Sequence, residues 1–98
     1  MAIKKQFLKS KPVCKITFKV PAQAEELSVV GDFNNWDASA NPLKKLKNGA
    51  FTGSIDVESG KSYEFKYVAD TTNYFNDEQA DSYQFNEYAG SENGVLNL

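Results

Sequence analysis

The sequence predicts an all-β protein, an antiparallel β-sandwich. Three observations lead to this prediction: apolar and polar residues alternate in several short segments, turn-forming residues separate these segments, and no stretch shows helical periodicity of useful length. Alternation with a period of two puts one face of a strand into a core and the other into solvent. Short alternating strands at close spacing are typical of antiparallel sandwiches.

Residues 14–20 carry the clearest alternation. Positions 14, 16, 18 and 20 are apolar, whereas Lys, Thr and Lys occupy positions 15, 17 and 19. We therefore expect Cys14 to lie in the core as a small apolar residue, and not to act as a nucleophile. Pro12 separates this strand from the preceding segment. Residues 1–12 are accordingly expected to form an extended N-terminal arm, and residues 13–98 a single domain.

Five further strands are expected, at residues 27–30, 43–47, 51–57, 62–69 and 95–98. Asn48-Gly49 predicts a type I′ hairpin turn, in which both central residues have positive φ. In residues 62–69 the alternation turns Glu64, Lys66 and Val68 outward. Residues 71–93 show no alternation. A loop of this length without regular structure is either functional or packed by its own aromatic side chains.

Composition and charge exclude several function classes. The 98 residues are 41% hydrophobic with a formal net charge of -2, which fits one globular domain and gives no electrostatic case for nucleic acid or an anionic membrane. No apolar segment reaches the ~20 residues of a membrane span. Most of the lysines precede Val20, where no acidic residue occurs, and no basic residue follows Lys66. This segregation indicates either pairing of the chain ends or solvated faces, and we expect solvated faces.

Cysteine usage and the N-terminal sequence bear on the compartment. Cys14 is the only cysteine, so no internal disulfide can form. The first residues are not followed by the apolar run of a secretory signal. We therefore expect a cytoplasmic protein.

An enzyme is not expected. The chain contains no histidine, which removes the commonest general base and metal ligand. A glycosidase needs two carboxylates ~5–9.5 Å apart across a cleft, and no acidic residue stands in a recognisable motif of that kind. Asp70, Asp77 and Asp81 could offer oxygen ligands to a cation such as calcium, but their spacing fits no known loop pattern. We expect no catalytic residue, no metal and no cofactor.

Residues 29–37, Val-Val-Gly-Asp-Phe-Asn-Asn-Trp-Asp, run from a strand into a polar loop. Gly31 can end the strand, and the asparagines favour turns. Phe33 and Trp36 need not point the same way, so one ring can anchor the loop while the other faces out. An exposed indole among amides suits a sugar, because the indole face contacts C–H groups and the amides bind hydroxyls. Trp36 is therefore either a sugar platform or a core residue.

Several segments together resemble one family. They are Gly31-Asp32-Phe33-Asn34-Asn35-Trp36, Pro42-Leu43, Asn48-Gly49-Ala50-Phe51, Tyr63-Glu64-Phe65-Lys66-Tyr67-Val68-Ala69-Asp70 and Gly90-Ser91-Glu92-Asn93-Gly94-Val95. Over residues 14–98 the chain resembles an isoamylase-type early-set domain, carbohydrate-binding module family 48. That family includes the glycogen-binding domain of the AMP-activated protein kinase β subunit and the N-terminal domains of branching and debranching enzymes. The resemblance implies an immunoglobulin-like sandwich of the early-set type.

The resemblance also implies a sugar site for α-1,4-linked glucans such as glycogen, starch and maltooligosaccharides. Five residues match it: Trp36 and Tyr74 as two tilted aromatic platforms, Lys66 as an outward donor, and Ser91 and Asn93 as the hydroxyl and amide of the closing segment. The family's second tryptophan is replaced by Tyr74, which offers a smaller ring. The leucine that threads the sugar helix in the kinase subunit falls at Ala89, which is too small for that role, and Tyr88 is its candidate substitute.

Each of these residues also has a purely structural interpretation. Lys66 on an exposed strand is often only solvated, Tyr74 can hold its own loop down, and Asn93 can form a turn. The chain is thus expected to be a non-catalytic α-glucan-binding module. The alternative is a structural or protein-interaction module that partners a glycoside hydrolase or another protein in trans and does not itself bind sugar. Exposure of the aromatic residues distinguishes the two.

Overall fold

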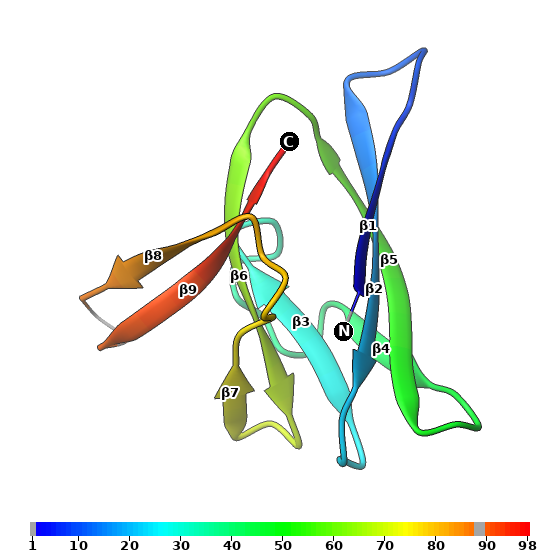
Figure 1. Cartoon of the computed structure of the whole chain (residues 1–98), viewed down its shortest axis with the longest axis vertical. Coiled ribbons are helices and arrows are strands. Elements are labelled where there is room, and N and C mark those ends of the chain that lie inside the picture. The colour runs from blue at the N-terminus through cyan, green and yellow to red at the C-terminus, as the bar shows by residue number, and fades with distance from the viewer. Residues whose placement is uncertain (1, 88–89) are drawn as a thin grey trace.

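The computed structural model describes residues 2–87 and 90–98, which contain nine strands (Figure 1). The strands are β1 (Ala2–Phe7), β2 (Val13–Pro21), β3 (Leu27–Gly31), β4 (Pro42–Lys45), β5 (Ala50–Glu58), β6 (Ser62–Ala69), β7 (Asn73–Phe75), β8 (Ser82–Asn86) and β9 (Ser91–Asn97). Every pairing between them is antiparallel. Within the described residues, no helix has the length and apolar composition that a bilayer crossing requires.

The strands follow one continuous path, in the order β1-β2-β5-β4-β3-β6-β9-β8, with β7 paired to β6. The short strand β4 pairs with both β5 and β3, and the path folds over at this strand (Figure 1). The β1, β2 and β5 strands form one layer, and β3, β6 and β9 form the other. Ring contacts join the layers, because Phe18 of β2 lies 5.9 Å from the centroids of both Phe65 and Tyr67 of β6. This arrangement confirms the predicted immunoglobulin-like antiparallel sandwich.

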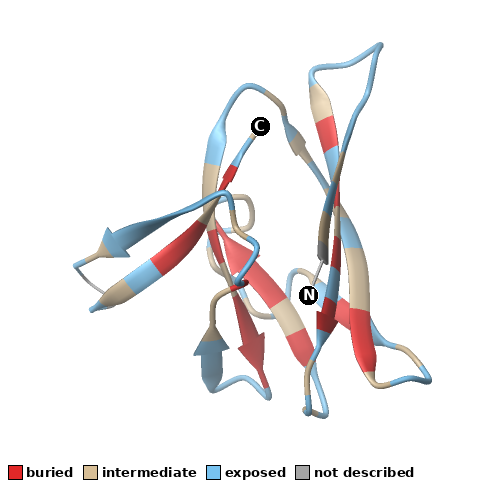
Figure 2. Cartoon of the chain, in the orientation of Figure 1, coloured by how far each residue is buried: buried red, intermediate tan, exposed pale blue. Residues whose placement is uncertain are grey.

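The core lies between the two layers and follows the predicted alternation (Figure 2). The inward residues of β2 are fully buried, namely Cys14, Ile16, Phe18 and Val20. Cys14 is a free, buried thiol, as predicted. Burial of an aliphatic or aromatic side chain of this size contributes about 1.5–3 kcal/mol, so the inward face of β2 is a large stabilising element.

The segment expected as an extended arm is part of the sheet. Strand β1 pairs with β2 along its whole length, from Ala2 opposite Lys19 to Phe7 opposite Cys14. Ile3, on this strand, packs against the core cluster. Residues 2–7 are thus extended, as predicted, but they form an edge strand and not a separate arm. Their mixed patterning hid this role, because an edge strand buries little of either face.

The Asn48-Gly49 turn differs from the predicted type I′ geometry. Gly49 has a φ of 89°, whereas Asn48 does not have a positive φ. The N–H of Gly49 donates to the Leu46 carbonyl at 3.0 Å, and the N–H of Leu46 donates to the Ala50 carbonyl at 2.7 Å. The loop therefore has three residues, with a turn followed by one left-handed glycine, which is the next most common hairpin connection. The Asn48 side chain accepts from the Ala50 N–H at 3.0 Å, and this bond closes the loop.

Residues 71–93 are more regular than expected. They contain β7, which pairs with β6, and β8, which forms a hairpin with β9. The last strand begins at Ser91, four residues before the predicted start. The absence of alternation has a physical cause, since β7 has only three residues and β8 leaves nearly all its side chains exposed. A strand without a buried face gives no periodic sequence pattern.

A buried tyrosine–aspartate pair fixes the connection between β7 and β8. The Tyr67 hydroxyl donates to Asp77 Oδ2 at 2.6 Å, and both residues are fully buried. Asp77 Oδ1 accepts from the Gln79 N–H at 2.7 Å, and its carbonyl accepts from the Tyr83 hydroxyl at 2.6 Å. Burial, followed by the hydrogen bond to Asp77, raises the pKa of the Tyr67 hydroxyl far above its ordinary value. The hydroxyl therefore stays a donor at any pH the protein encounters.

The segregated lysines have two different environments. Five of them are exposed, as expected for solvated faces: Lys4, Lys9, Lys11, Lys15 and Lys19. Lys5 differs, because its ammonium pairs with Asp81 and also donates to the Asn97 carbonyl at 3.2 Å. The Asn97 N–H donates to the same Asp81 carboxylate at 2.8 Å. At this position the segments near the two ends of the chain are joined, so the expectation of solvated faces is wrong for Lys5.

The Tyr67–Asp77 hydrogen bond can be tested by removing one hydroxyl. Tyr67→Phe leaves the buried Oδ2 of Asp77 without its donor, and we expect the free energy of unfolding to fall by about 1–3 kcal/mol. Urea denaturation followed by Trp36 fluorescence measures this change. Tyr63→Phe is the control, because the Tyr63 hydroxyl donates to an exposed Glu58 carbonyl at 2.9 Å. Equal effects from the two substitutions would contradict a special role for the buried pair.

The contacts of Asp81 with Lys5 and Asn97 predict that the stability of the protein depends on pH. Burial raises the pKa of the Asp81 carboxyl, but the hydrogen bonds from Lys5 and the Asn97 N–H outweigh burial and hold this pKa below its ordinary value. A pKa that is lower in the folded state stabilises the protein above the unfolded-state pKa of about 4, and this stabilisation is lost as the pH falls through the folded-state value. Asp81→Asn should therefore lower the melting temperature at pH 7 and have little effect near pH 2.

Melting curves between pH 2 and pH 7 check this expectation, with Glu78→Gln as the control for loss of an exposed carboxylate. A difference between Asp81→Asn and the parent that stays constant over the whole range would be incompatible with the proposed linkage. A larger destabilisation at low pH than at neutral pH would have the wrong sign.

Candidate functional site

The central strand β6 carries a second face, directed away from the core. It pairs with β3, β7 and β9, so Glu64, Lys66 and Val68 lie in the middle of one sheet. Opposed residues in an antiparallel pair share a face. The cross-strand neighbours of these three side chains are therefore Ser28 and Val30 of β3, Tyr74 of β7 and Val95 of β9. Two further residues of β9, Ser91 and Asn93, hydrogen-bond to Lys66 and Glu64. We call this surface the outer face. Val68 lies on it as predicted, although it is buried.

The loop after β3 is fixed by one asparagine. Asn34 Oδ1 accepts from the Gly31 N–H at 3.0 Å, and its Nδ2 donates to the Val29 carbonyl at 3.0 Å and to Asn41 Oδ1 at 2.7 Å. These bonds join both ends of the loop. A Cβ at Gly31 would lie 2.5 Å from the Glu64 carbonyl and 2.8 Å from the Phe33 ring. Glycine is thus required here for space.

Phe33 and Trp36 point in different directions, as predicted for this loop. The Phe33 ring lies 6.2 Å from the Tyr63 ring, centroid to centroid, and packs against the core cluster. Trp36 is half-exposed and does not belong to the core. Its indole N–H donates to Asp32 Oδ1 at 3.2 Å. Phe33 therefore anchors the loop and leaves Trp36 at the surface.

Trp36 is held in an unusual backbone conformation. Asn35 and Trp36 have consecutive φ values of 55° and 57°. A left-handed conformation is ordinary for asparagine, but for a bulky residue such as tryptophan it costs roughly 1 kcal/mol or more. The surrounding hydrogen bonds supply this energy. Asp32 takes part, because its Oδ2 accepts from the Glu64 N–H at 2.9 Å while Oδ1 accepts from the indole.

Hydrogen bonds join four of the five predicted site residues in two separate groups, Lys66 with Ser91 and Trp36 with Asn93. Lys66 Nζ donates to Ser91 Oγ at 2.8 Å, so these two are in direct contact. Asn93 Nδ2 donates to Glu64 Oε1 at 3.2 Å, and Trp36 is linked through Asp32 to the backbone of Glu64. An ammonium group has three hydrogens, so Lys66 retains donors for a ligand.

Asn93 is less available than the resemblance implies. Its side chain is only 2% exposed and its amide already donates to Glu64. It can reach a ligand only if the Glu64 side chain moves, or it can act by holding Glu64 in place. The turn that Asn93 was alternatively expected to form is absent, since the residue lies inside β9.

Tyr74 is the most exposed of the five, with 52% of its surface accessible. It lies on β7 opposite Val68, one pleat from Lys66 on the same face. Among the described residues, no hydrogen bond or ring contact joins it to Trp36, Lys66, Ser91 or Asn93. The next residue, Phe75, packs on Tyr67 at 5.5 Å between ring centroids. Phe75, and not Tyr74, therefore anchors β7 to the core. The ring of Tyr74 is thus free to contact a ligand.

The remaining candidates were the residues at positions 88 and 89 and three aspartates considered as cation ligands. Tyr88 and Ala89 lie outside the described residues. Asp70, Asp77 and Asp81 do not converge, because Asp77 binds Tyr67, Asp81 binds Lys5, and Asp70 accepts from two backbone N–H groups. In residues 2–87 and 90–98, no three side chains of the metal-ligating types lie close enough to share an ion.

Two residues of the network were not predicted as part of the site. Glu64 was recognised as outward-facing, but its bond to Asn93 depends on β9 beginning before residue 93, which the sequence did not indicate. Asp32 was quoted only as part of the loop motif. Its position one residue after a buried strand and four before the tryptophan is the only available indication of the bond to the indole.

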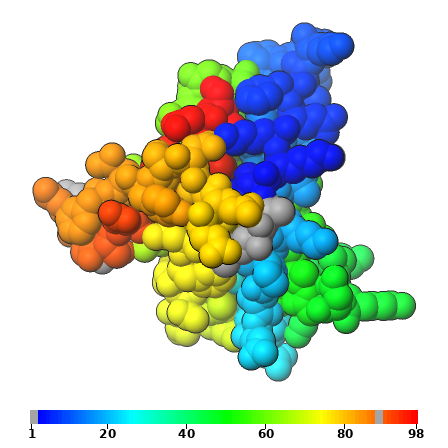
Figure 3. Space-filling view, viewed as in Figure 1, coloured from blue at the N-terminus to red at the C-terminus, as the bar shows by residue number. Residues whose placement is uncertain are grey.

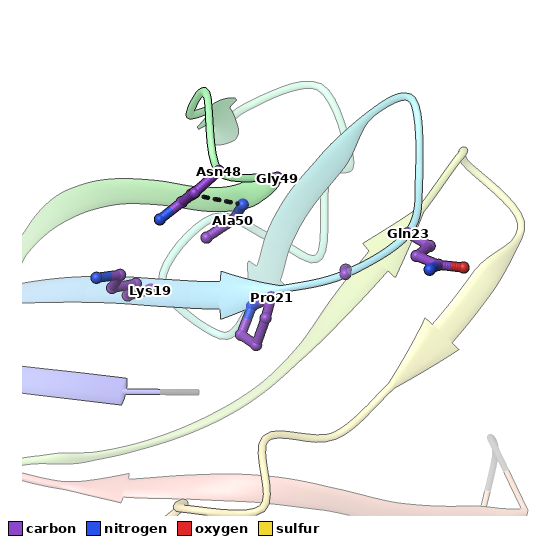
Figure 4. Close-up of a pocket in the computed structure, with 7 residues that line it drawn as sticks. Lys19, Pro21, Gln23, Asn48, Gly49 and Ala50 are labelled. Atoms are coloured by element: carbon purple, nitrogen blue, oxygen red, sulfur yellow. Dashed lines mark hydrogen bonds between the residues drawn. The ribbon is translucent and has the colours of Figure 1, made fainter.

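One surface hollow lies away from these residues. It has a volume of about 680 Å³ and is lined by Lys19, Pro21, Ala22, Gln23, Asn48, Gly49 and Ala50, at two adjoining turns (Figure 4). It contains no aromatic side chain. The side-chain oxygen of Asn48 is already bonded to the Ala50 N–H, as the dashed line in Figure 4 shows. This hollow therefore lacks the stacking surface that the outer face provides.

Comparison with known proteins adds independent findings. The family described as carbohydrate-binding module 48 (isoamylase N-terminal domain) matches residues 9–89. The chain is also similar to the 1,4-alpha-glucan branching enzyme GlgB of Photobacterium profundum, with 35% identity over 57 residues. That alignment covers 56% of this chain and 8% of the enzyme, so the similarity concerns a small part of the enzyme's length.

The family match spans both layers of the sandwich and includes the Trp36 loop, Lys66 and Tyr74. It agrees with the fold, with the loop motif and with the outward lysine of β6. The chain therefore belongs to the carbohydrate-binding module 48 family, the isoamylase N-terminal domains.

Proposed function

We propose that this chain is a non-catalytic module that binds α-1,4-linked glucans such as glycogen or maltooligosaccharides. The observation that supports this most strongly is the ordered environment of Trp36. A half-exposed indole is held by Asp32 in a strained conformation, and the same carboxylate accepts from the strand that carries Lys66. Strain of this kind persists where the surrounding structure imposes it, which is common at binding sites.

The chemistry of the outer face suits a neutral sugar. The rings of Trp36 and Tyr74 offer apolar surfaces to the C–H groups of glucose units. Lys66 and Ser91, joined at 2.8 Å, offer an ammonium and a hydroxyl to the sugar hydroxyl groups. In the site that the resemblance implies, the two rings are tilted, and tilted rings favour the curved chain of an α-glucan over a flat cellulose chain.

The affinity is expected to be low. An open site with two aromatic rings and a few exchangeable hydrogen bonds should have a dissociation constant between ~10 µM and ~1 mM, or about 4–7 kcal/mol of binding free energy. The hydrogen bonds of the free protein reinforce this expectation, because a sugar hydroxyl must share or replace partners that Lys66 and Asn93 already have.

The absence of catalysis and a cytoplasmic location belong to the same proposal. Both are supported by the lack of histidine in the chain and by the burial of its one cysteine as a free thiol. The similarity to part of a branching enzyme supports a role beside glucan chemistry. A glycoside hydrolase or related enzyme, in the same chain or in trans, is the corresponding proposed partner.

One observation favours the alternative of a protein-interaction module. The β8–β9 hairpin projects from one side of the sandwich (Figures 1 and 3), and Phe85 on β8 is 58% exposed. Tyr83 lies on the same face of the hairpin and is also exposed. Exposed aromatic residues on an edge strand are typical of contact surfaces. If the chain is a protein-interaction module, adding a sugar should cause no change at the outer face.

Titration of Trp36 fluorescence separates the two functions. Because Trp36 is the only tryptophan, a saturable change with maltoheptaose, and none with cellohexaose, is expected in the range of ~10 µM to ~1 mM. Lys66→Ala should abolish or strongly weaken the response, whereas Lys15→Ala, on the other sheet, should not. Nanomolar affinity, or a flat trace at millimolar maltoheptaose, would contradict the proposal, and the flat trace would favour the interaction module.

Asp32 provides a second test, as a positioning residue. Asp32→Ala removes both the acceptor for the Trp36 indole and the acceptor for the Glu64 N–H. We expect a rise in the maltoheptaose dissociation constant of about threefold to tenfold, ~0.7–1.4 kcal/mol, and a shifted indole N–H resonance in the free protein.

Asp37→Ala is the matched control for Asp32→Ala. Asp37 belongs to the same loop, but its carboxylate bonds to the Ser39 N–H and hydroxyl, at 2.9 Å and 2.7 Å, and not to Trp36. Asp32→Asn retains the indole acceptor and should restore part of the affinity. If Asp32→Ala left the indole resonance in place, or if both alanine variants had the same affinity, Asp32 would have no positioning role.

A further inference from the structure

A groove next to the outer face extends the surface that a glucan can contact. We propose that this groove is a second subsite, which takes the glucose units of a longer α-glucan beyond those held at Trp36, Lys66 and Tyr74. This inference rests on the proposed function. It assigns a ligand to a region that none of the five predicted site residues touches.

The groove has the size of a small-molecule site. Its volume is about 550 Å³, within the usual range of ~300–1,000 Å³. It lies between the segment that enters β3, the start of β4 and the turn between β6 and β7. Its lining includes Val68, Ser28, Pro42, Glu26, Asp70 and Thr71.

The groove is continuous with the outer face. Val68 contributes to its lining, and the same residue is the cross-strand partner of both Ser28 and Tyr74. Along β6, Val68 follows Lys66 on the same side of the strand, a step of about 7 Å. A sugar chain that extends from Lys66 past Tyr74 along β6 therefore runs toward the groove.

The lining combines an apolar floor with a polar rim. Pro42 is exposed and Ala38 is partly exposed, so they supply apolar surface for sugar C–H groups, whereas Val68, Leu43 and Phe51 are buried and offer little of it. Ser28, Ser39 and Thr71 supply hydroxyls to the rim. Apolar surface with a few polar groups is the usual composition of a small-molecule site. This composition matches a glucose ring, which has C–H groups on its faces and hydroxyl groups around its edge.

Asp70 leaves an acceptor for the ligand. Its Oδ1 accepts from the N–H groups of Glu25 and Glu26, both at 3.0 Å, which joins the β6–β7 turn to the entry of β3. Its Oδ2 has no hydrogen bond among the described residues, and the residue belongs to the groove lining. A carboxylate oxygen is a strong acceptor for a sugar hydroxyl.

Backbone strain occurs in this turn as it does at Trp36. Asp70 and Thr71 have consecutive φ values of 51° and 64°. For a β-branched residue such as Thr71 this conformation is an outlier, and such outliers cluster at ligand sites. The two strained pairs, 35–36 and 70–71, thus belong to the two neighbouring regions that one glucan chain would contact.

The charge of the rim selects against other ligand classes. Glu25, Glu26 and Asp70 contribute three carboxylates, and Lys45 contributes the only basic side chain among the groove residues. The Lys45 ammonium already donates to the Ala24 carbonyl at 3.2 Å. An excess of carboxylates repels phosphates and other anions, whereas it accepts hydrogen bonds from neutral hydroxyl groups.

Amide chemical-shift mapping of the unmodified chain tests the subsite directly. Maltoheptaose should shift the backbone amides of Lys66 and Trp36 and also those of Ser28 and Thr71, with one common saturation curve. Maltotriose, which is too short to cover both regions, should shift the first pair more strongly than the second. Shifts at Lys66 and Trp36 without any at Ser28 and Thr71 would overturn the subsite and leave the proposed function intact. No shift anywhere would overturn both.

A blocking variant with a matched control gives the second test. Ser28→Leu, at a half-buried strand position in the groove, should weaken maltoheptaose binding by at least about threefold and leave maltotriose binding unchanged. Ser54→Leu makes the same replacement on β5, away from the groove, and should leave both affinities unchanged. Melting temperatures establish that both variants fold. Parent-like binding of maltoheptaose by folded Ser28→Leu would overturn the inference.

Discussion

The hydrogen bond between Tyr67 and Asp77 is the interaction on which most of this structure depends. A carboxylate in a fully buried position is tolerated only when it has hydrogen-bond partners, and the Asp77 carboxylate has them from Tyr67 and Gln79. The backbone carbonyl of Asp77 also accepts from the Tyr83 hydroxyl. These bonds connect the central strand to the β7–β8 segment. Because Tyr67 also contacts the rings of Phe18, Phe65 and Phe75, the same residue joins both layers of the sandwich.

The position of Tyr67 determines the direction of its neighbours. Successive side chains of a strand point to opposite faces, so fixing Tyr67 inward directs Lys66 and Val68 outward. The outer face therefore depends on the rigidity of the core beneath it. The strained turn at 35–36 follows β3, which pairs with β6, and the strained turn at 70–71 follows β6 itself. At both places the hydrogen bonds of the sheet can offset the energy of the strained backbone.

Alternation predicted the fold wherever a strand has one buried face. Strands β2 and β6 show this, with Cys14, Phe18 and Tyr67 inside as expected. It did not predict β1, β7 or β8, because edge strands and very short strands bury too little for a periodic pattern. The hairpin at Asn48-Gly49 was located correctly, but its loop length depends on the register between β4 and β5, which the dipeptide does not specify. The pairing of Lys5 with Asp81 joins residues 76 positions apart, and a local pattern cannot identify such a contact.

In the candidate site, too, contacts between residues far apart in the sequence could not be predicted. The motif and the family resemblance identified Trp36 and Lys66, but not the partners that decide how available each group is. Asp32 and Glu64 became apparent only when the register of β3, β6 and β9 was known. That register also shows why Asn93 is buried, since it sits inside β9 with Gln84 of β8 opposite it. If the outer face binds a glucan, its polar groups mostly exchange existing hydrogen bonds, which yields little net free energy. The gain must then come mainly from the exposed rings of Trp36 and Tyr74, with the polar groups setting the orientation of the sugar.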